Sequence, residues 1–168
     1  MAVLSGAVLS AAVLSAAERL RARARAANIR LSTAESCTGG LLAGAITEVP
    51  GASEMFECGF VTYSDAAKRS LLGVRAATLA AHGAVSEPVA REMAEGALAR
   101  GNAALAVAIT GIAGPGGSAH KPEGRVCFAR AGLGPTIAET VEFGARGRRA
   151  VRQASVEHAL RLLIGALS

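Results

Sequence analysis

The sequence has few aromatic residues, few cysteines and no tryptophan. Aromatic side chains make up 3% of its 168 residues, and Cys37, Cys58 and Cys127 lie far apart without a C-x-x-C pair. No histidine stands at a metal-ligand spacing, so the pattern argues against a disulfide framework and against a zinc site. We therefore expect a chain without a metal that works in a reducing compartment, the cytoplasm.

Charged residues are also scarce, at 18% of the chain, whereas apolar residues make up 51%. This balance excludes a disordered protein and predicts a core of small aliphatic side chains. A chain of this length forms one ordinary domain and buries roughly 70% of the surface that it exposes when unfolded. The net charge is +5, but many basic residues fall in two helical stretches, 19–30 and 146–161. We interpret these as solvated helix faces and predict no nucleic-acid partner.

The first residues repeat Ala-Val-Leu-Ser three times within residues 1–15. No basic residue precedes this apolar run, it is too short to span a bilayer, and it continues into the charged helical segment 18–23. The pattern therefore predicts an atypical apolar helical extension of the single domain 1–168, without membrane association. Such an extension is a candidate surface for assembly of a homo-oligomer.

Strand and helix patterns alternate through the first part of the chain, and a hairpin pattern comes late. Helix capping signals stand at Ser64 and Ser86, and Gly101 ends a helix. We therefore expect one mixed sheet covered by helices on both faces. The predicted strands are 29–33, 56–63, 105–109, 125–131 and 136–143, and the predicted helices include 41–46, 87–100 and 146–167.

A serine stands at the predicted turn from the first strand into a helix, in Thr33-Ala-Glu-Ser-Cys-Thr-Gly-Gly. This position exposes the Ser36 hydroxyl and directs free backbone N–H groups at whatever the hydroxyl attacks. Those amides are candidates for an oxyanion hole. The alternative from local sequence alone is that Ser36 or Thr38 merely caps the helix.

A serine nucleophile needs a base, and the three histidines lack a carboxylate placed to orient them, which argues against a Ser-His-Asp triad. Lys68 is the best candidate, because it falls in the first turn of a helix that follows Tyr63 at the end of a strand. A buried lysine with a lowered pKa can accept the proton as a neutral amine. The alternatives are a solvated Lys68 beside Asp65 and a half-buried strand tyrosine.

A glycine-rich loop, Thr110-Gly-Ile-Ala-Gly-Pro-Gly-Gly, follows a continuous apolar run that predicts a buried strand. Loops at this position bind ligands in α/β sheets, and the glycines let backbone amides converge on an anion. The spacing matches neither a dinucleotide fingerprint nor a P-loop. The alternative is a plain mobile surface loop.

Taken together, these segments resemble the C-terminal domain of the CinA (competence/damage-inducible) family, whose stand-alone members are nicotinamide-nucleotide amidases. The resemblance extends from about residue 16 to 163 and is carried by four ordered motifs: the serine and glycine-rich segments above, Gly59-Phe-Val-Thr-Tyr-Ser-Asp-Ala-Ala-Lys, and Gly83-Ala-Val-Ser-Glu-Pro-Val-Ala. It implies a three-layer α/β/α sandwich with a mixed, mostly parallel sheet. It also implies hydrolysis of nicotinamide mononucleotide to nicotinic acid mononucleotide and ammonia, without metal or cofactor.

Carried over to this sequence, the resemblance implies that Ser36 is the nucleophile of a covalent acyl-enzyme and that Lys68 and Tyr63 handle the proton. The implied partner is a small-molecule nucleotide substrate. Its oxyanion, ribose and phosphate would be bound by residues of the two Gly-containing motifs and by one arginine: Glu35, Cys37, Thr38, Gly39, Gly40, Thr110, Gly111, Gly114, Gly116 and Arg146.

The sequence departs from the family pattern near its last helix, where relatives often have Gly-Asp-Arg and this chain has Gly144-Ala145-Arg146. The function of that acid is then missing, while Arg146 remains to meet a phosphate. The larger N-terminal nucleotide-processing domain of full-length relatives is also missing. Two alternatives stay open: a non-catalytic nucleotide-binding module, and a competence- or DNA-damage-associated interaction domain that uses the basic helices.

Overall fold

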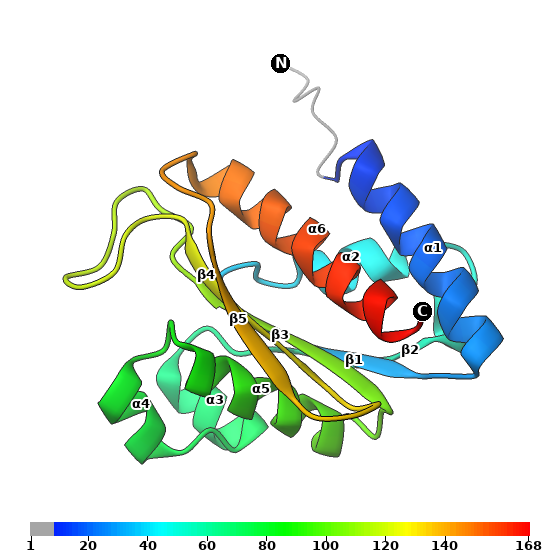
Figure 1. The fold of residues 1–168 in the computed structure, drawn as a ribbon, viewed down its shortest axis with the longest axis horizontal. Helices are drawn as coiled ribbons and strands as arrows, with labels where there is room; N and C mark the ends of the chain where they lie inside the picture. Colours follow the sequence, from blue (N-terminus) through cyan, green and yellow to red (C-terminus); the bar gives the residue numbers. More distant parts are fainter. Residues whose placement is uncertain (1–8) are drawn as a thin grey trace, which may run out of the picture.

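A computed structural model describes residues 9–168 as a five-stranded sheet with helices on both faces (Figure 1). The strands are β1 (Leu31–Glu35), β2 (Phe56–Val61), β3 (Leu105–Gly111), β4 (Arg125–Ala131) and β5 (Ile137–Glu142). The helices are α1 (Ala11–Ala27), α2 (Leu41–Thr47), α3 (Asp65–Leu72), α4 (Ala76–His82), α5 (Glu87–Arg100) and α6 (Arg148–Ala166), with one 3-10 turn, η1 (Ala52–Glu54).

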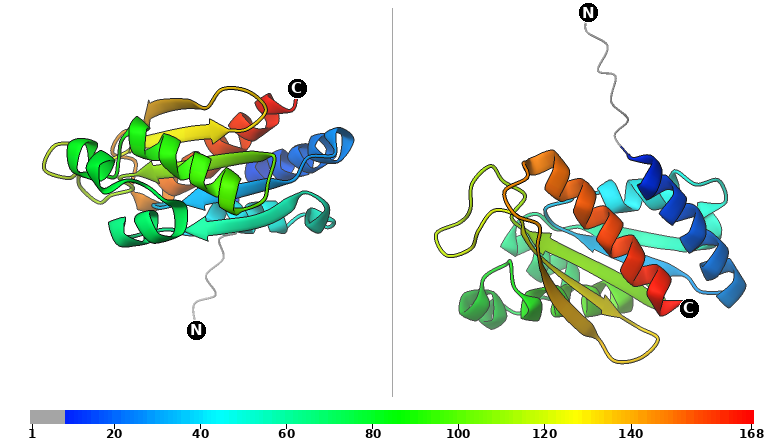
Figure 2. Two further views of the ribbon diagram at one scale, coloured as in Figure 1. Left: turned by 90° about the horizontal axis from the view of Figure 1, so that it is seen from below. Right: turned by 45° about the horizontal axis from the view of Figure 1, so that its top comes forward.

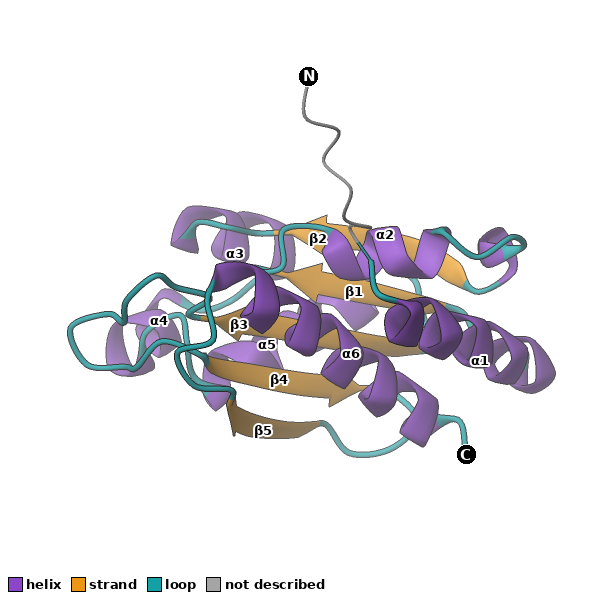
Figure 3. Cartoon of the chain, turned by 90° about the horizontal axis from the view of Figure 1, so that it is seen from above, coloured by secondary structure: helices purple, strands orange, loops and turns teal. Residues whose placement is uncertain are grey.

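The sheet has the strand order β2-β1-β3-β4-β5 (Figure 3). Strand β1 pairs in parallel with both β2 and β3, whereas β3 with β4 and β4 with β5 are antiparallel. Four strands thus run in one direction and β4 alone runs against them, which confirms the expected mixed sheet. Parallel pairing brings the carboxyl ends of β1, β2 and β3 to the same edge, the place where open α/β sheets bind ligands.

Two helical layers cover the sheet, with α1, α2 and α6 on one face and α3, α4 and α5 on the other (Figures 1 and 3). Strand β3 contributes to both cores, because side chains alternate across a strand. Leu105, Val107 and Ile109 pack toward α1 and α6, whereas Ala106 and Ala108 pack toward α5. This accounts for the continuous apolar run from which the strand was predicted.

The predicted capping residues begin helices as expected. Ser64 accepts a hydrogen bond from Ala67 N at 3.1 Å, and Ser86 accepts one from Val89 N. Helix α1 begins after Ser10, so the final part of the predicted extension 1–15 is helical, while residues 1–8 lie outside the described residues.

Several predicted boundaries differ from the structure by two residues, and the second strand ends at Val61 and not at Tyr63. Two of the differences have a clear local reason. The first strand lies two residues later than expected, since Asn28 ends α1 in a left-handed conformation and the strand begins only at Leu31. Helix α6 begins at Arg148 because Gly147 has a positive φ of 88°, a non-helical conformation that glycine adopts readily. None of the helices within residues 9–168 combines the length and the hydropathy that a bilayer-spanning segment requires.

Candidate active site

Ser36 is the first residue after β1, at the edge where three parallel strands end. Its backbone N–H donates to Ile109 O of β3 at 2.9 Å, and its carbonyl accepts from Gly39 N at 3.0 Å. On the other side, Thr62 N donates to Glu35 O at 2.8 Å, which continues the pairing of β1 with β2. The serine is 9% exposed and is therefore held at a fixed place between the two neighbouring strands.

Lys68 reaches this serine from α3. Its side chain is 1% exposed, and its Nζ donates to Ser36 Oγ at 2.9 Å and to Thr62 O at 2.7 Å. Burial lowers the pKa of the Lys68 ammonium below that of an ordinary lysine, against smaller opposing effects of Asp65 and Cys37. The structure thus brings together the two residues predicted as nucleophile and base, and excludes the solvated alternative for Lys68.

Glu35 precedes Ser36 and points to the opposite face of the sheet, as strand alternation requires. It is fully buried, and its carboxylate oxygens accept from Leu42 N at 2.9 Å and Ala43 N at 3.1 Å. Helix α2 has no side-chain cap from Gly40. Glu35 therefore supplies acceptors for its first amides, which ties α2 to the end of β1.

The turn between Ser36 and α2 contains backbone donors without a protein acceptor in the described part of the chain. Gly39 and Gly40 have φ values of 58° and 99°, which let the chain turn tightly. Within residues 9–168, the N–H groups of Thr38 and Gly40 donate to no protein acceptor. Burial raises the pKa of the Cys37 thiol to about 11, so this cysteine stays protonated at neutral pH and is a poor nucleophile.

The glycine-rich loop begins beside Ser36 and extends outward from the sheet (Figures 1 and 2). Thr110 is buried, and its Oγ1 donates to Ala84 O at 2.9 Å. The next residue, Gly111, ends β3. Gly114 has a φ of 91°, and a Cβ on it would lie 1.9 Å from Glu123 Oε1. Gly116 N donates to Glu123 Oε2 at 3.2 Å, so Glu123, in the part of the loop that leads back to the sheet, stabilises the loop.

Tyr63 and this loop are joined by an arginine that was not predicted. Arg148, the first residue of α6, donates to Tyr63 Oη at 2.9 Å and to Gly114 O at 2.9 Å. Tyr63 is 63% exposed. Within residues 9–168 no hydrogen bond joins its hydroxyl to Ser36 or Lys68. The structure therefore brings Tyr63 to the edge of the site rather than into contact with the two central residues.

A second arginine of α6 holds the turn that follows Ser36. Arg152 donates through Nε to Cys37 O and through a terminal nitrogen to Thr38 O, both at 3.1 Å. Residues four apart lie on one helix face, so the spacing of Arg148 and Arg152 was a signal for this role. The predicted Arg146 is exposed and precedes the helix, and within the described chain its side chain makes no hydrogen bond to the other site residues.

No group of three or more metal-binding side chains gathers anywhere between residues 9 and 168. Of the histidines, His158 lies on α6 and pairs with Glu139 of β5. Around Ser36, a serine hydroxyl is in hydrogen-bond contact with a buried amine, which is the geometry that a serine nucleophile with an amine base requires.

The family described as the CinA C-terminal domain matches residues 13–167. The chain belongs to this family. It is 54% identical to a CinA-like protein of Anaeromyxobacter dehalogenans over 84% of this chain and 35% of that protein. It is 51% identical to the nicotinamide-nucleotide amidohydrolase PncC of Escherichia coli over 84% of this chain and 85% of that protein.

A solved family structure has the same fold. The competence/damage inducible protein CihA of Agrobacterium tumefaciens superposes with a TM-score of 0.92 at 44% identity, covering 100% of both chains. Several CinA-like relatives are longer, and the chain spans about a third of their length. The expected three-layer α/β/α fold of the CinA C-terminal domain is thereby confirmed.

Proposed function

We propose that this chain is an amidohydrolase that converts nicotinamide mononucleotide to nicotinic acid mononucleotide and ammonia, with Ser36 as nucleophile and Lys68 as base. The observation that carries the proposal is the 2.9 Å contact between Lys68 Nζ and Ser36 Oγ in a buried environment. The relative from Escherichia coli, named for an activity on nicotinamide nucleotides, supports the substrate class.

In the proposed reaction, the neutral amine of Lys68 takes the proton of Ser36 Oγ as this oxygen attacks the amide carbon. The N–H groups of Thr38 and Gly40 stabilise the developing oxyanion. The ammonium then returns the proton to the amide nitrogen, and the carbon–nitrogen bond breaks to release ammonia. Water attacks the resulting ester with Lys68 again as base, which releases the acid and restores the serine.

We assign the roles of the surrounding residues from their contacts. Arg148 donates hydrogen bonds to both Tyr63 and Gly114. Its guanidinium supplies the positive charge for the phosphate, the role that the sequence suggested for Arg146. We assign substrate binding to Arg148 and the loop from Thr110. Glu35 and Arg152 instead hold the turn that carries the nucleophile, since their polar atoms bind backbone groups of that turn and of α2.

The test is ammonia release from nicotinamide mononucleotide by the purified protein without added metal. We expect release by the native chain and by Ser53→Ala, a matched control at an exposed serine of η1, and none above background by Ser36→Ala. If the native chain releases no ammonia, or Ser36→Ala is equally active, the proposal is wrong. Binding of the nucleotide by calorimetry without turnover would favour the non-catalytic binding module instead.

A further inference from the structure

The sequence contains two lysines, Lys68 in the proposed active site and Lys121 in the return limb of the glycine-rich loop. Lys121 is partly buried and does not project freely into solvent. Its Nζ donates to His82 O at 2.7 Å and also to Val85 O. Both acceptors belong to the turn 82–85 between α4 and α5, so one ammonium group ties this turn to the loop.

The backbone of the turn fits closely against the ammonium. Gly83 has a φ of 73°, and a Cβ on it would lie 3.1 Å from Lys121 Nζ. Two carbonyls that accept from one cation form charge-assisted hydrogen bonds, which are stronger than neutral ones. The turn is therefore held on both sides of Ala84.

Ala84 connects this tie to the nucleophile. Its carbonyl, between the two that Lys121 binds, accepts from Thr110 Oγ1 at 2.9 Å. Thr110 follows Ile109, whose carbonyl accepts from the backbone N–H of Ser36. Hydrogen bonds, joined by short stretches of backbone, thus connect the Lys121 ammonium through the turn to Ile109, which pairs with Ser36.

The turn and the loop also line an open pocket of about 500 Å³, a volume typical of small-molecule sites. Its lining combines apolar residues, which are alanines of α4 with Val85 and Ile112, with polar ones, which are His82, Ser118, His120 and Lys121. No acidic side chain lines it. A shift of the turn would change the shape of this pocket and the direction of the Thr110 hydroxyl together.

We propose that Lys121 is a positioning residue for substrate binding, which acts through the turn 82–85 on Thr110. This rests on the proposed function for its kinetic readout. The nucleophile and base are held by other contacts, from α2, α3 and α6, so loss of Lys121 affects binding of the substrate more than the chemical step.

The first experiment compares Lys121→Met with Lys121→Arg and with Arg19→Met, which removes one positive charge from an exposed position of α1. For Lys121→Met we expect KM for nicotinamide mononucleotide to rise about tenfold, because the variant loses charge-assisted hydrogen bonds. We expect kcat to stay within about twofold of the native value. Lys121→Arg keeps donors at this place and restores part of the loss, and Arg19→Met matches the native chain. A fall in kcat with unchanged KM would overturn the proposal.

The second experiment combines Lys121→Met with Thr110→Val, which removes the hydroxyl but keeps the side-chain shape. If Lys121 acts through the turn on Thr110, the double variant has a KM no more than about twofold above that of the worse single variant, because coupled residues are not additive. Multiplication of the two effects would show that Lys121 acts separately, and would overturn the proposal.

A readout without turnover separates this proposal from the proposed function. Amide hydrogen exchange should accelerate in residues 82–85 and 112–124 of Lys121→Met, but not in Arg19→Met and not in β1. If the native chain releases no ammonia, the proposed function fails, but the exchange pattern still tests whether Lys121 holds the turn 82–85 against the loop. Unchanged exchange in both segments would show that Lys121 does not hold the turn and the loop together, and would overturn the proposal.

Discussion

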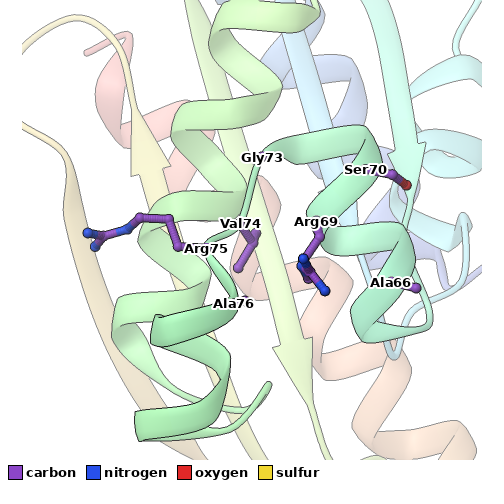
Figure 4. Close-up of a pocket in the computed structure, with 7 residues that line it drawn as sticks. All are labelled: Ala66, Arg69, Ser70, Gly73, Val74, Arg75 and Ala76. Atoms are coloured by element: carbon purple, nitrogen blue, oxygen red, sulfur yellow. The ribbon is translucent and has the colours of Figure 1, made fainter.

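Lys68 and Arg69 are consecutive basic residues on α3, yet they face opposite environments. Lys68 is buried against Ser36 with both of its acceptors at hydrogen-bond distance. Arg69 is exposed, and its side chain points into a groove of about 530 Å³ between α3 and α4 (Figure 4). The difference between a proposed base and a surface charge is therefore set by which side of one helix carries each residue.

The two sides of α3 also differ in how their polar groups are held. On the sheet side, the side chains of Glu35, Lys68 and Arg152 bind groups of the segment from Ser36 to the start of α2. On the groove side, Arg75 begins α4, points away from the groove (Figure 4) and pairs with Glu92 of α5. None of the residues predicted for the active site lines that groove. Changes on the sheet side should thus affect chemistry, and changes on the groove side should affect only stability.

The largest expected effect is that of Lys68→Met. Methionine keeps the apolar stem and removes the amine, so kcat for ammonia release should fall about a thousandfold, as expected for loss of a general base. The neighbour on the other side of α3 provides the control, because Arg69→Met also removes one cation but should leave kcat unchanged. Equal losses in both variants would show that charge, and not the position of the amine, matters.

The pH dependence of the native chain should report the same amine. Burial lowers the pKa of Lys68, and only the neutral amine can accept the serine proton. Activity therefore rises with pH, by about tenfold per unit below the midpoint, and the midpoint of kcat/KM lies below the ordinary range of lysine. Lys68→Met should lose this rise, whereas a native midpoint at or above the ordinary value would contradict the assignment.

Glu35→Gln tests whether the turn itself needs to be held. Glutamine offers one acceptor oxygen and a second group that can only donate, so one amide at the start of α2 loses its partner. We expect a cost of about 1–3 kcal/mol in the free energy of unfolding and a fall in kcat of about tenfold, with KM little changed. Glu48→Gln at the exposed end of α2 is the matched control for urea unfolding and kinetics. A rise in KM alone would return Glu35 to the substrate-binding role predicted from the sequence.

The smallest effect is expected on the groove side, for Glu92→Gln. Burial acts to raise the pKa of this carboxyl, but hydrogen bonds from Arg75 N and Thr78 and the charge of Arg75 outweigh it and lower the pKa. A lowered pKa in the folded state means stability that is present above the unfolded pKa and is lost as pH falls through the folded value.

Glu92→Gln should therefore cost about 1 kcal/mol in unfolding free energy at neutral pH, and the difference from the native chain should shrink in acid. Thermal unfolding at several pH values measures this, with ammonia release as the second readout. A substantial loss of kcat in this variant would break the distinction between the two sides of α3.

Local signals explain most of what could be predicted about the fold. The cap at Ser86 and the stop at Gly101 bound α5 correctly, because caps depend on residues within one helical turn. The apolar run of β3 was equally clear. Helix α4 was not delimited, since it is short and its N-cap residue, Arg75, provides no side-chain cap.

The candidate site was predictable in its motifs but not in its contacts. Ser36 and Lys68 are 32 residues apart, and their contact depends on the register that pairs Glu35 with Val61 and so brings Thr62 beside Ser36. The bend at Gly147 likewise decided that Arg148 reaches Tyr63 and Gly114. No spacing in the sequence encodes such distances.

The amino-acid sequence by itself determined the family, the alternation of strands and helices, and the identity of the serine and the lysine. These follow from residue types and from interactions within a few positions. The tertiary structure decided that Lys68 faces the serine while Arg69 faces solvent, that Glu35 binds α2 and that Lys121 holds a distant turn. Those outcomes depend on burial and strand register, which exist only once the sheet and both helical layers have assembled.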